Sequence, residues 1–497
     1  MNLAVAHFFQ LCVVAAFGAV CGSFLNVVIY RLPRGLSVVR PRWSFCPQCG
    51  LRINWYDNIP VLGWLRLGAR CRKCRFVIPP IYPLVETLGA LIFLTVWDVV
   101  VRSEQAMGFG GYGPMLVAHL ALYSGLLACS AMDIESYTVD VRIPIATIAI
   151  ACLCHVGRSA AGLQVPSDGP GAVLAGSTAD LQTAAHAFLS PFIYLVALAA
   201  GGVWLATLLF CLALRRPLPG GDAAASNELD DAHGTDAHAA PELSNSAARF
   251  SPGSVLILSG VVAGFIVWQS GWPQSPPDWR VSMPLLRMAS AAGIFMTILI
   301  LASGVSRPSD CEVVEEIEAG RGAARGLATR EFALLLPALI AGLALALCLR
   351  QRGYLAAGWD FVQHESWFSS VIGRLALGLG LGAGSAVLGA GLGWAVRLLG
   401  TWGFGKEALG TGDIYILAAI AAAAGFWNAF YGFFLASLLA LVGVVATAFR
   451  KRTRAIPFGP WLALGSFVAL ALEPSLNRFF APMRSLIWSL AGGPING

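Results

Sequence analysis

Apolar segments long enough to cross a lipid bilayer recur along the whole chain, and they restrict it to helical membrane folds. Hydrophobic residues make up 57% of the 497 residues and charged residues 12%, about half the charged share of a soluble domain. A spanning helix needs about 17–25 mostly apolar residues. Shorter apolar stretches at 143–157 and 478–491 are borderline, and the second is either a thirteenth span or an interfacial helix. The candidate spans are 5–29, 82–101, 114–132, 143–157, 190–213, 253–271, 283–303, 331–349, 374–398, 413–428, 430–448 and 457–472. The sequence therefore predicts an all-α polytopic membrane protein of about 12 transmembrane helices.

Basic residues in the loops set the expected orientation of these spans. They are concentrated after the first span, and short loops rich in Lys and Arg stay in the cytoplasm. That loop is therefore predicted to be cytoplasmic, with the N-terminus outside and the first span retained. The net charge of +6 is small for this length, so no nucleic-acid partner is predicted. The basic residues of the loop are Arg31, Arg34, Arg40, Arg42, Arg66, Arg70, Arg72, Lys73 and Arg75.

Four of the twelve cysteines form a pattern within this cytoplasmic loop. They lie in two CxxC pairs, Cys46 with Cys49 and Cys71 with Cys74, separated by 21 residues, Gly50 to Arg70. Two such turns provide the tetrahedral set of four thiolates that zinc prefers, and cytosolic thiols stay reduced. We therefore expect a zinc-ribbon-like loop with a structural zinc ion, and two disulfides are the alternative. His233 and His238, in the polar stretch 217–250, are interpreted as solvated loop residues.

Two aspartates are set at the boundaries of predicted spans. Asp133 follows the third span, and Asp413 begins the tenth, after Gly410-Thr411-Gly412. A carboxylate at a membrane boundary is unfavourable, so it indicates a functional site. Six predicted spans separate the two aspartates, an even number that returns the chain to the same face. A pair of carboxyls that share one proton can act as acid and base, although aspartates that couple ions in a transporter remain an alternative. Glu135 and Asp140 are interpreted as solvated loop charges.

Several separated blocks of the sequence resemble the prepilin peptidase family, the type IV leader peptidases of pilus and type II secretion systems. The similarity covers roughly residues 10–157 and 371–472. It is specific because the blocks occur in the family's order. The blocks are Gly22-Ser23-Phe24-Leu25-Asn26-Val27-Val28-Ile29-Tyr30-Arg31-Leu32-Pro33, Cys46-Pro47-Gln48-Cys49, Asp57-Asn58-Ile59-Pro60, Cys71-Arg72-Lys73-Cys74, Ile81-Tyr82-Pro83-Leu84-Val85-Glu86, Lys406-Glu407-Ala408-Leu409-Gly410-Thr411-Gly412-Asp413 and Ile456-Pro457-Phe458-Gly459-Pro460.

The resemblance implies an aspartic endopeptidase of the bacterial inner membrane, with its active site facing the cytoplasm. It would cleave the leader peptide of prepilins or pseudopilins, with Asp133 and Asp413 as the catalytic pair. It also implies N-methylation of the new N-terminus with S-adenosylmethionine, for which no binding residues are assigned. Membrane lipid is a further expected partner, and no oligomeric state is predicted. A presenilin-like intramembrane protease shares the Gly-x-Gly-Asp motif but gives no account of the cysteine loop.

Three features depart from the family pattern. Residues 158–370 are an insertion, predicted to add about four helices and two cytoplasmic loops. Asp140 and Val141 stand where the family has Pro followed by Asp or Asn, and Tyr415 replaces a lysine. An altered substrate preference is compatible with these changes.

The predicted divisions are a first transmembrane helix (1–32), the four-cysteine region (33–81), a membrane segment with the first catalytic aspartate (82–157), the insertion (158–370), a membrane segment with the Gly-x-Gly-Asp motif (371–472) and a C-terminal helix (473–497).

Overall fold

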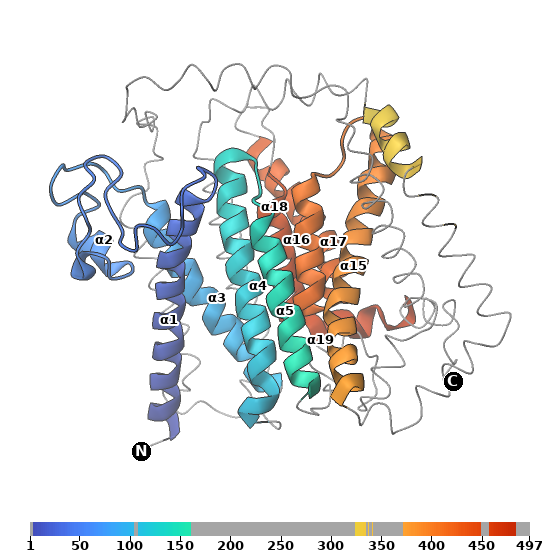
Figure 1. Ribbon diagram of the computed structural model, residues 1–497, viewed down its shortest axis with the longest axis horizontal. Coiled ribbons are helices and arrows are strands. Elements are labelled where there is room, and N and C mark those ends of the chain that lie inside the picture. The colour runs from blue at the N-terminus through green and yellow to red at the C-terminus, as the bar shows by residue number, and fades with distance from the viewer. Residues whose placement is uncertain are drawn as a thin grey trace.

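The described part of the chain is a bundle of helices (Figure 1). The computed structural model describes residues 3–103, 108–160, 324–333, 336, 340, 371–448 and 457–483. Besides a helical segment at 324–333, it contains a 3₁₀ turn at Trp55–Asp57 and ten α-helices within these ranges. The helices are α1 (Leu3–Arg31), α2 (Leu62–Arg66), α3 (Ile81–Ser103), α4 (Gly108–Ser136), α5 (Arg142–Ala160), α15 (Val371–Phe404), α16 (Thr411–Ala424), α17 (Phe426–Ala448), α18 (Gly459–Ala471) and α19 (Glu473–Phe479).

Six of these helices are long and apolar enough to cross a membrane. This confirms an all-helical polytopic fold, whereas the figure of about 12 spans stays a prediction. The predicted spans 190–213, 253–271 and 283–303 lie outside the described residues, as do most of 331–349 and the end of 478–491. The six candidate spans are Phe9–Arg31, Ile81–Val101, Tyr112–Glu135, Arg142–Ala160, Gly378–Phe404 and Phe426–Val445.

The two helices that follow α15 differ from their predicted boundaries. The expected span 413–428 ends at Ala424, because Gly425 adopts a φ of 88° that few other residues tolerate. The next helix therefore begins at Phe426 rather than at residue 430. With 14 and 13 residues, α16 and α18 are shorter than a full bilayer span. The apolar residues on both sides of Gly425 hid this boundary, since a single glycine hardly changes the mean hydropathy of a span-length window.

The short helix α16 lies inside the bundle. It packs against α5, α15 and α17 and also touches α4 and α18, and Figure 1 shows it among these helices. Its residues Ile416 to Ala424 are buried, with Leu417 and Ile420 fully inaccessible. On one side of the bundle, α1 packs along α3. Helix α16 is therefore a core element, supported by lateral contacts rather than by lipid.

The chain ends of several helices meet at one end of the bundle. Figure 1 shows the loop that contains α2 beside the C-terminal end of α1, at the same end as the C-termini of α4 and α15. The N-termini of α5, α16 and α18 also lie there. Asp133 near the end of α4 and Asp413 at the start of α16 therefore share this end with the four-cysteine loop.

Candidate active site and four-cysteine cluster

Asp133 lies in the last turn of α4 and is held by the N-terminus of α18. Its side chain is buried, with 6% of the residue exposed. The backbone N–H of Gly459, the first residue of α18, donates a hydrogen bond to Oδ2 of Asp133 at 2.9 Å. A Cβ atom on residue 459 would lie 2.7 Å from the same oxygen, so this approach requires glycine. A helix N-terminus also favours a negative charge, so α18 both orients and stabilises the carboxylate.

Asp413 occupies the first turn of α16, where its carboxylate turns back towards the start of the helix. Gly410 is the N-cap residue, and its backbone lies against the Asp413 carboxylate, since a Cβ atom built on Gly410 would be 3.4 Å from Oδ2. Asp413 is the third residue of the helix, the position whose side chain reaches back to the N-cap residue in a capping box. The side chain is partly buried. The local geometry therefore gives Asp413 a fixed position relative to its own helix.

The fold brings the two aspartates to one site. Helices α4 and α18 pack together and both touch α16, and Asp133 lies in the last turn of α4 while Asp413 lies in the first turn of α16. A Cβ atom on Gly412 would lie 3.0 Å from Cβ of Val139, so the start of α16 sits against the loop that leaves α4. Two carboxyls so placed cannot both ionise cheaply, and together they can supply a proton acceptor and a proton donor.

The acidic residues beside Asp133 have different surroundings. Asp140 accepts bidentate hydrogen bonds from Arg142, and its side chain is only 14% exposed. The hydrogen bonds from Arg142 lower the pKa of the Asp140 carboxyl. The interpretation of Asp140 as a solvated charge is therefore wrong, because the adjacent guanidinium binds it in the turn before α5. Glu135 is exposed and forms an ion pair with Arg34 at 3.2 Å.

The four cysteines of the loop converge on one point. Their Sγ atoms all lie within 4.8 Å of one another. The separation is 3.8 Å between Cys46 and Cys74 and 4.0 Å between Cys49 and Cys71, whereas a disulfide bond is close to 2.0 Å. All four are free thiols, so the alternative of two disulfides is not observed. Four sulfur atoms at this spacing could bind a metal ion.

The two CxxC segments fold as matching turns. In the first turn, the N–H of Cys46 donates a hydrogen bond to the carbonyl of Leu51, and the N–H of Gly50 donates to the carbonyl of Cys46. In the second turn, the N–H of Cys71 donates to the carbonyl of Phe76, and the N–H of Arg75 donates to the carbonyl of Cys71. Burial opposes ionisation of Cys71, but hydrogen bonds from backbone N–H groups and neighbouring thiols lower its pKa to about 7. The loop thus has a ligand set in which one thiol is readily deprotonated, as metal binding requires.

Three polar contacts fix this loop to the membrane helices and to itself. Arg31, at the end of α1, donates to four backbone carbonyls between Ser37 and Trp43 at 2.9–3.3 Å. Glu86 of α3 accepts a hydrogen bond from Val61 N–H at 2.7 Å. Within the loop, Arg72 forms a bidentate ion pair with Asp57 at 2.6 and 2.8 Å. These contacts enclose a cavity of about 180 Å³ between the loop and the ends of α1 and α3.

Sequence reasoning missed two parts of the aspartate site. Gly459 was noted only as part of a family block, and its backbone N–H contact depends on a fold in which α18 meets α4. Arg397 of α15 hydrogen-bonds to the carbonyl of Leu409, just before the Gly410 cap. A signal for Arg397 existed, because an arginine inside a predicted span is rare enough to indicate function.

Comparison with known proteins identifies the N-terminal part of the chain. The model of the bacterial peptidase A24 N-terminal domain matches residues 16–99. The similarity to the peptidase A24 family is thus established for this part of the chain. The resemblance to prepilin peptidases is thereby confirmed. The A24 domain includes all four cysteines of the cluster but neither aspartate, so it does not test their role.

Curated relatives extend this result. The chain is 41% identical over 128 residues to a prepilin leader peptidase/N-methyltransferase of Myxococcus xanthus, covering 26% of this chain and 35% of that protein. It is 38% identical over 136 residues to a type 4 prepilin-like proteins leader peptide-processing enzyme of Escherichia coli, covering 24% and 46%. The chain thus spans less than half the length of these two A24 relatives. No solved structure matches it.

Proposed function

We propose that this chain is an aspartic endopeptidase of the bacterial inner membrane that removes the leader peptide of prepilins or pseudopilins. The observation that carries the proposal is that the end of α4, with Asp133, and the start of α16, with Asp413, lie at one end of the bundle, in a chain whose N-terminal part matches the A24 N-terminal domain. Two relatives are named as enzymes that process such leaders. The site faces the cytoplasm because the arginine-rich loop lies at the same end.

The chemistry would require only the two carboxyls and water. One carboxylate accepts a proton from the attacking water, while its protonated partner donates to the oxygen of the scissile carbonyl. The N–H of Gly459 holds Asp133 during this exchange, and the backbone of Gly410 lies against Asp413. The apolar helix that follows a prepilin cleavage site would lie in lipid beside the bundle. The scissile bond would then lie at the membrane–water interface.

Cleavage of a prepilin-like peptide by purified protein in detergent tests the proposal. Asp133→Asn and Asp413→Asn should each abolish leader removal, since either change removes one half of the acid–base pair. Glu135→Gln, which alters an exposed carboxylate nearby, should leave cleavage unchanged. Cleavage that persists in both Asn variants would contradict the proposed dyad. Absence of cleavage by the unaltered chain, with ion-dependent uptake into liposomes, would instead favour an ion-coupled transporter.

We further propose that the four-cysteine cluster binds a structural zinc ion. All four ligand positions are thiols, so the site has no open position for water and no catalytic part in peptide hydrolysis. Zinc would hold together a loop that has little hydrophobic core of its own. Purified Cys46→Ser protein should contain less zinc than the unaltered chain, with Cys12→Ser as the control. Unchanged zinc content would exclude Cys46 as a ligand.

We assign the proposed N-methylation to the cavity beside this loop. S-adenosylmethionine carries an adenine ring and a methylated sulfonium cation, and it supplies the methyl group when bound. The cavity wall fits these groups, because it includes the rings of Tyr30, Phe45 and Tyr82 and the buried carboxylate of Glu86. Equilibrium dialysis with radiolabelled S-adenosylmethionine should show binding that Glu86→Gln weakens and Glu135→Gln does not. Equal binding by both variants would remove Glu86 from the site.

A further inference from the structure

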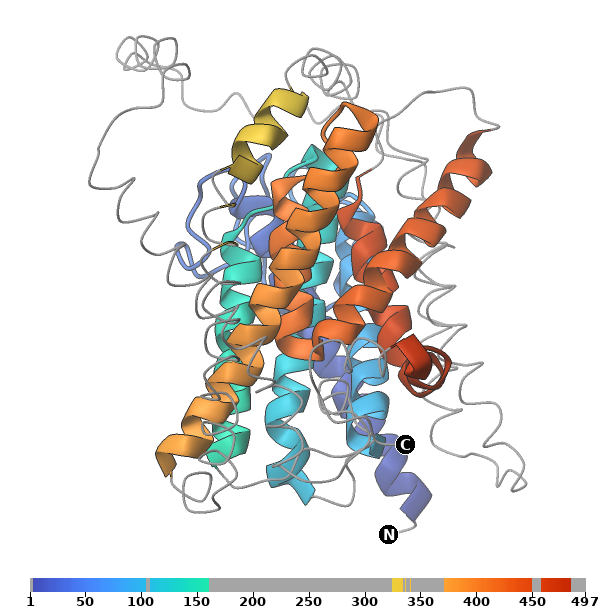
Figure 2. The same cartoon turned by 90° about the vertical axis from the view of Figure 1, so that its right-hand side faces the viewer.

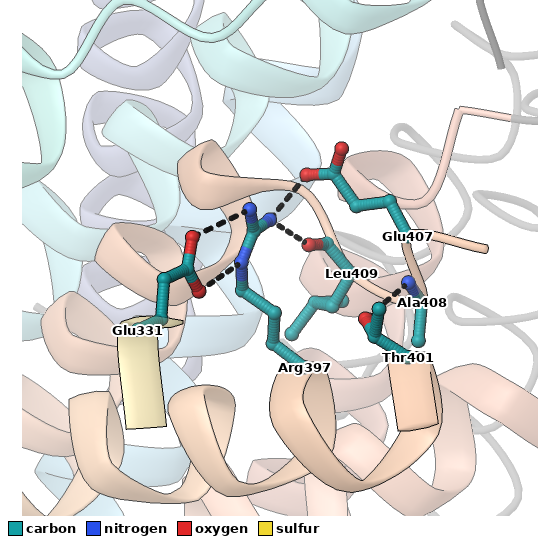
Figure 3. Close-up of polar contacts among 6 residues, drawn as sticks. All are labelled: Glu331, Arg397, Thr401, Glu407, Ala408 and Leu409. Atoms are coloured by element: carbon teal, nitrogen blue, oxygen red, sulfur yellow. Dashed lines mark hydrogen bonds and ion pairs between the residues drawn. The ribbon is translucent and has the colours of Figure 1, made fainter. Parts of the chain in front are cut away.

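Arg397 is a buried arginine whose hydrogen bonds converge on the loop before α16. Only 8% of its side chain is exposed, and Figure 3 shows the guanidinium between residues of two different segments. Nη1 donates to the carbonyl oxygen of Leu409 at 2.6 Å and also to the Glu407 carboxylate. One turn further along α15, Thr401 Oγ1 accepts a hydrogen bond from the backbone N–H of Ala408 at 3.3 Å. The end of α15 therefore holds three consecutive positions of the 407–409 segment.

The Leu409 carbonyl belongs to the same peptide group as the N–H of Gly410. The backbone of Gly410 lies against the Asp413 carboxylate, since a Cβ atom built on Gly410 would be 3.4 Å from Oδ2. Because a peptide group is planar and its C=O and N–H point in opposite directions, Arg397 at the oxygen end fixes the direction of the N–H at the other end. A cation at the carbonyl also polarises the peptide and strengthens its N–H as a donor. Arg397 thus acts on Asp413 through one peptide group, without touching it.

The helical segment 324–333 supports Arg397 from the other side. Glu331 forms an ion pair with the guanidinium, at 3.4 Å to Nε and 3.5 Å to Nη2. The same segment packs on Trp402, which makes a ring contact with Phe332 at 5.0 Å and a hydrogen bond to Thr329 at 3.3 Å. These residues belong to the region 158–370 that separates the two halves of the site in sequence. Figure 2 shows the segment beside the end of α15.

We propose that Arg397 is a positioning residue that fixes the Leu409–Gly410 peptide against Asp413, and that the inserted region supports it through Glu331. The proposal rests on the proposed peptidase function, because it concerns the same aspartate. In this proposal the inserted region helps to position Asp413. Loss of Arg397 would free the peptide to rotate and would weaken the donor that stabilises the ionised carboxylate. Loss of Glu331 would leave the contacts to Leu409 and Glu407 in place, so its effect is smaller.

Titration of Asp413 tests this link without relying on peptidase activity. Infrared difference spectra between each protein and its Asp413→Asn counterpart isolate the carboxyl band of Asp413 as the pH is varied. The groups that face this carboxyl are Asp133 of α4, the Gly410 amide, and beyond it Arg397 and Glu407. In Arg397→Gln the ionisation midpoint should move upward by about one pH unit, and in Glu331→Gln by less. Arg397→Lys keeps a cation near the carbonyl and should restore part of the shift.

Kinetics provide the second measurement. Arg397→Gln should lower kcat for leader cleavage about 10–100-fold, with the KM for the prepilin peptide nearly unchanged and the acidic limb of the pH profile moved upward. Arg478→Gln, a change to an exposed arginine of α19, is the matched control and should alter neither quantity. Thermal unfolding in detergent shows whether each variant is folded. If Arg397→Gln is not folded, Arg397→Lys is measured in its place.

The outcomes separate the inference from the proposed function. An Asp413 midpoint and a kcat that stay unchanged in folded Arg397→Gln would overturn the inference while leaving the peptidase proposal intact. A normal shift of the midpoint in a protein that cleaves no prepilin would support the link and refute the peptidase. An equal effect of Arg478→Gln would show that any lost arginine acts on the site, which would also overturn it.

Discussion

At the scale of single residues, the aspartate site depends on backbone amides as much as on carboxyls. The N–H of Gly459 binds Asp133, and the backbone of Gly410 lies against Asp413. Each amide is at the start of a helix, so the positive end of the helix dipole faces each acid. Burial of a carboxylate is tolerated only with such partners. The glycines are therefore part of the site and not only spacers that allow close packing.

Substitution of Gly459 tests this view. In Gly459→Ala the new Cβ would lie 2.7 Å from Oδ2 of Asp133, a separation that forces the carboxylate to move. A displacement of about 1 Å can reduce turnover about 100-fold, so we expect a loss of that size in kcat with the protein still folded. Gly391→Ala is the control, since a Cβ there meets nothing within 4 Å. Equal activity of both variants would contradict a fixed position for Asp133.

The Asp57–Arg72 ion pair predicts a pH dependence for the four-cysteine loop. The hydrogen bond from Arg72 lowers the pKa of the Asp57 carboxyl below its ordinary value of 3.8. Because the folded-state pKa is depressed, the pair stabilises the loop above pH 3.8 and loses this contribution as the pH falls through the lowered value. The stability difference between the unaltered chain and Asp57→Asn should therefore be constant near neutrality and shrink only below about pH 4.

Limited proteolysis of the loop as a function of pH measures this difference. Arg72→Gln should reproduce the behaviour of Asp57→Asn, because both changes break the same pair. A difference that persists unchanged at pH 2 would show that Asp57 acts through packing instead of charge.

At the scale of elements, glycine determines how closely the helices approach one another. Gly18 and Gly22, spaced by one helical turn on α1, face Gly89 and the backbone around Glu86 on α3. Small residues at this spacing let membrane helices meet backbone to backbone. This close approach bears on the four-cysteine loop because α1 ends in Arg31, which binds four backbone carbonyls of that loop. Helix α1 therefore couples membrane packing to the position of the four-cysteine cluster.

Gly18→Leu should separate α1 from α3. A Cβ on residue 18 would already lie 2.7 Å from the carbonyl oxygen of Gly89. A change of rotamer cannot relieve this clash, because it does not move the Cβ atom. We expect a loss of at least about 1–3 kcal/mol of stability, measured as a lower thermal unfolding midpoint in detergent. Gly157→Leu, at an exposed position of α5 with open space around it, should leave the midpoint unchanged.

At the scale of the whole molecule, the cysteine loop, the two aspartates and the 324–333 segment share one end of the bundle (Figure 1). Reporter fusions to alkaline phosphatase, which is active only outside the cytoplasm, test the orientation. Fusions after Thr138 and after Leu409 should be inactive, because both residues lie at the arginine-rich end. A fusion after Ala160, at the opposite end of α5, should be active. The reverse pattern would place the aspartates on the outer face.

The sequence predicted the parts of this arrangement that depend on composition and spacing. The α1, α3, α4 and α5 spans follow from apolar length, and the cysteine cluster follows from the two CxxC pairs. The convergence of Asp133 and Asp413 was expected from the even number of spans between them. The contacts of Gly459 and Arg397 were not predicted, because they depend on which helices become neighbours. The break at Gly425 was missed because a single glycine hardly changes the mean hydropathy of a span-length window.

The matching turns of the cysteine loop have a consequence for its durability. Residue 50 and residue 75 occupy equivalent places, with φ values of 66° and 59°, yet the first is glycine and the second arginine. A left-handed backbone costs a side-chain-bearing residue about 1–2 kcal/mol. Arg75→Gly should therefore raise the temperature at which the four-cysteine loop melts.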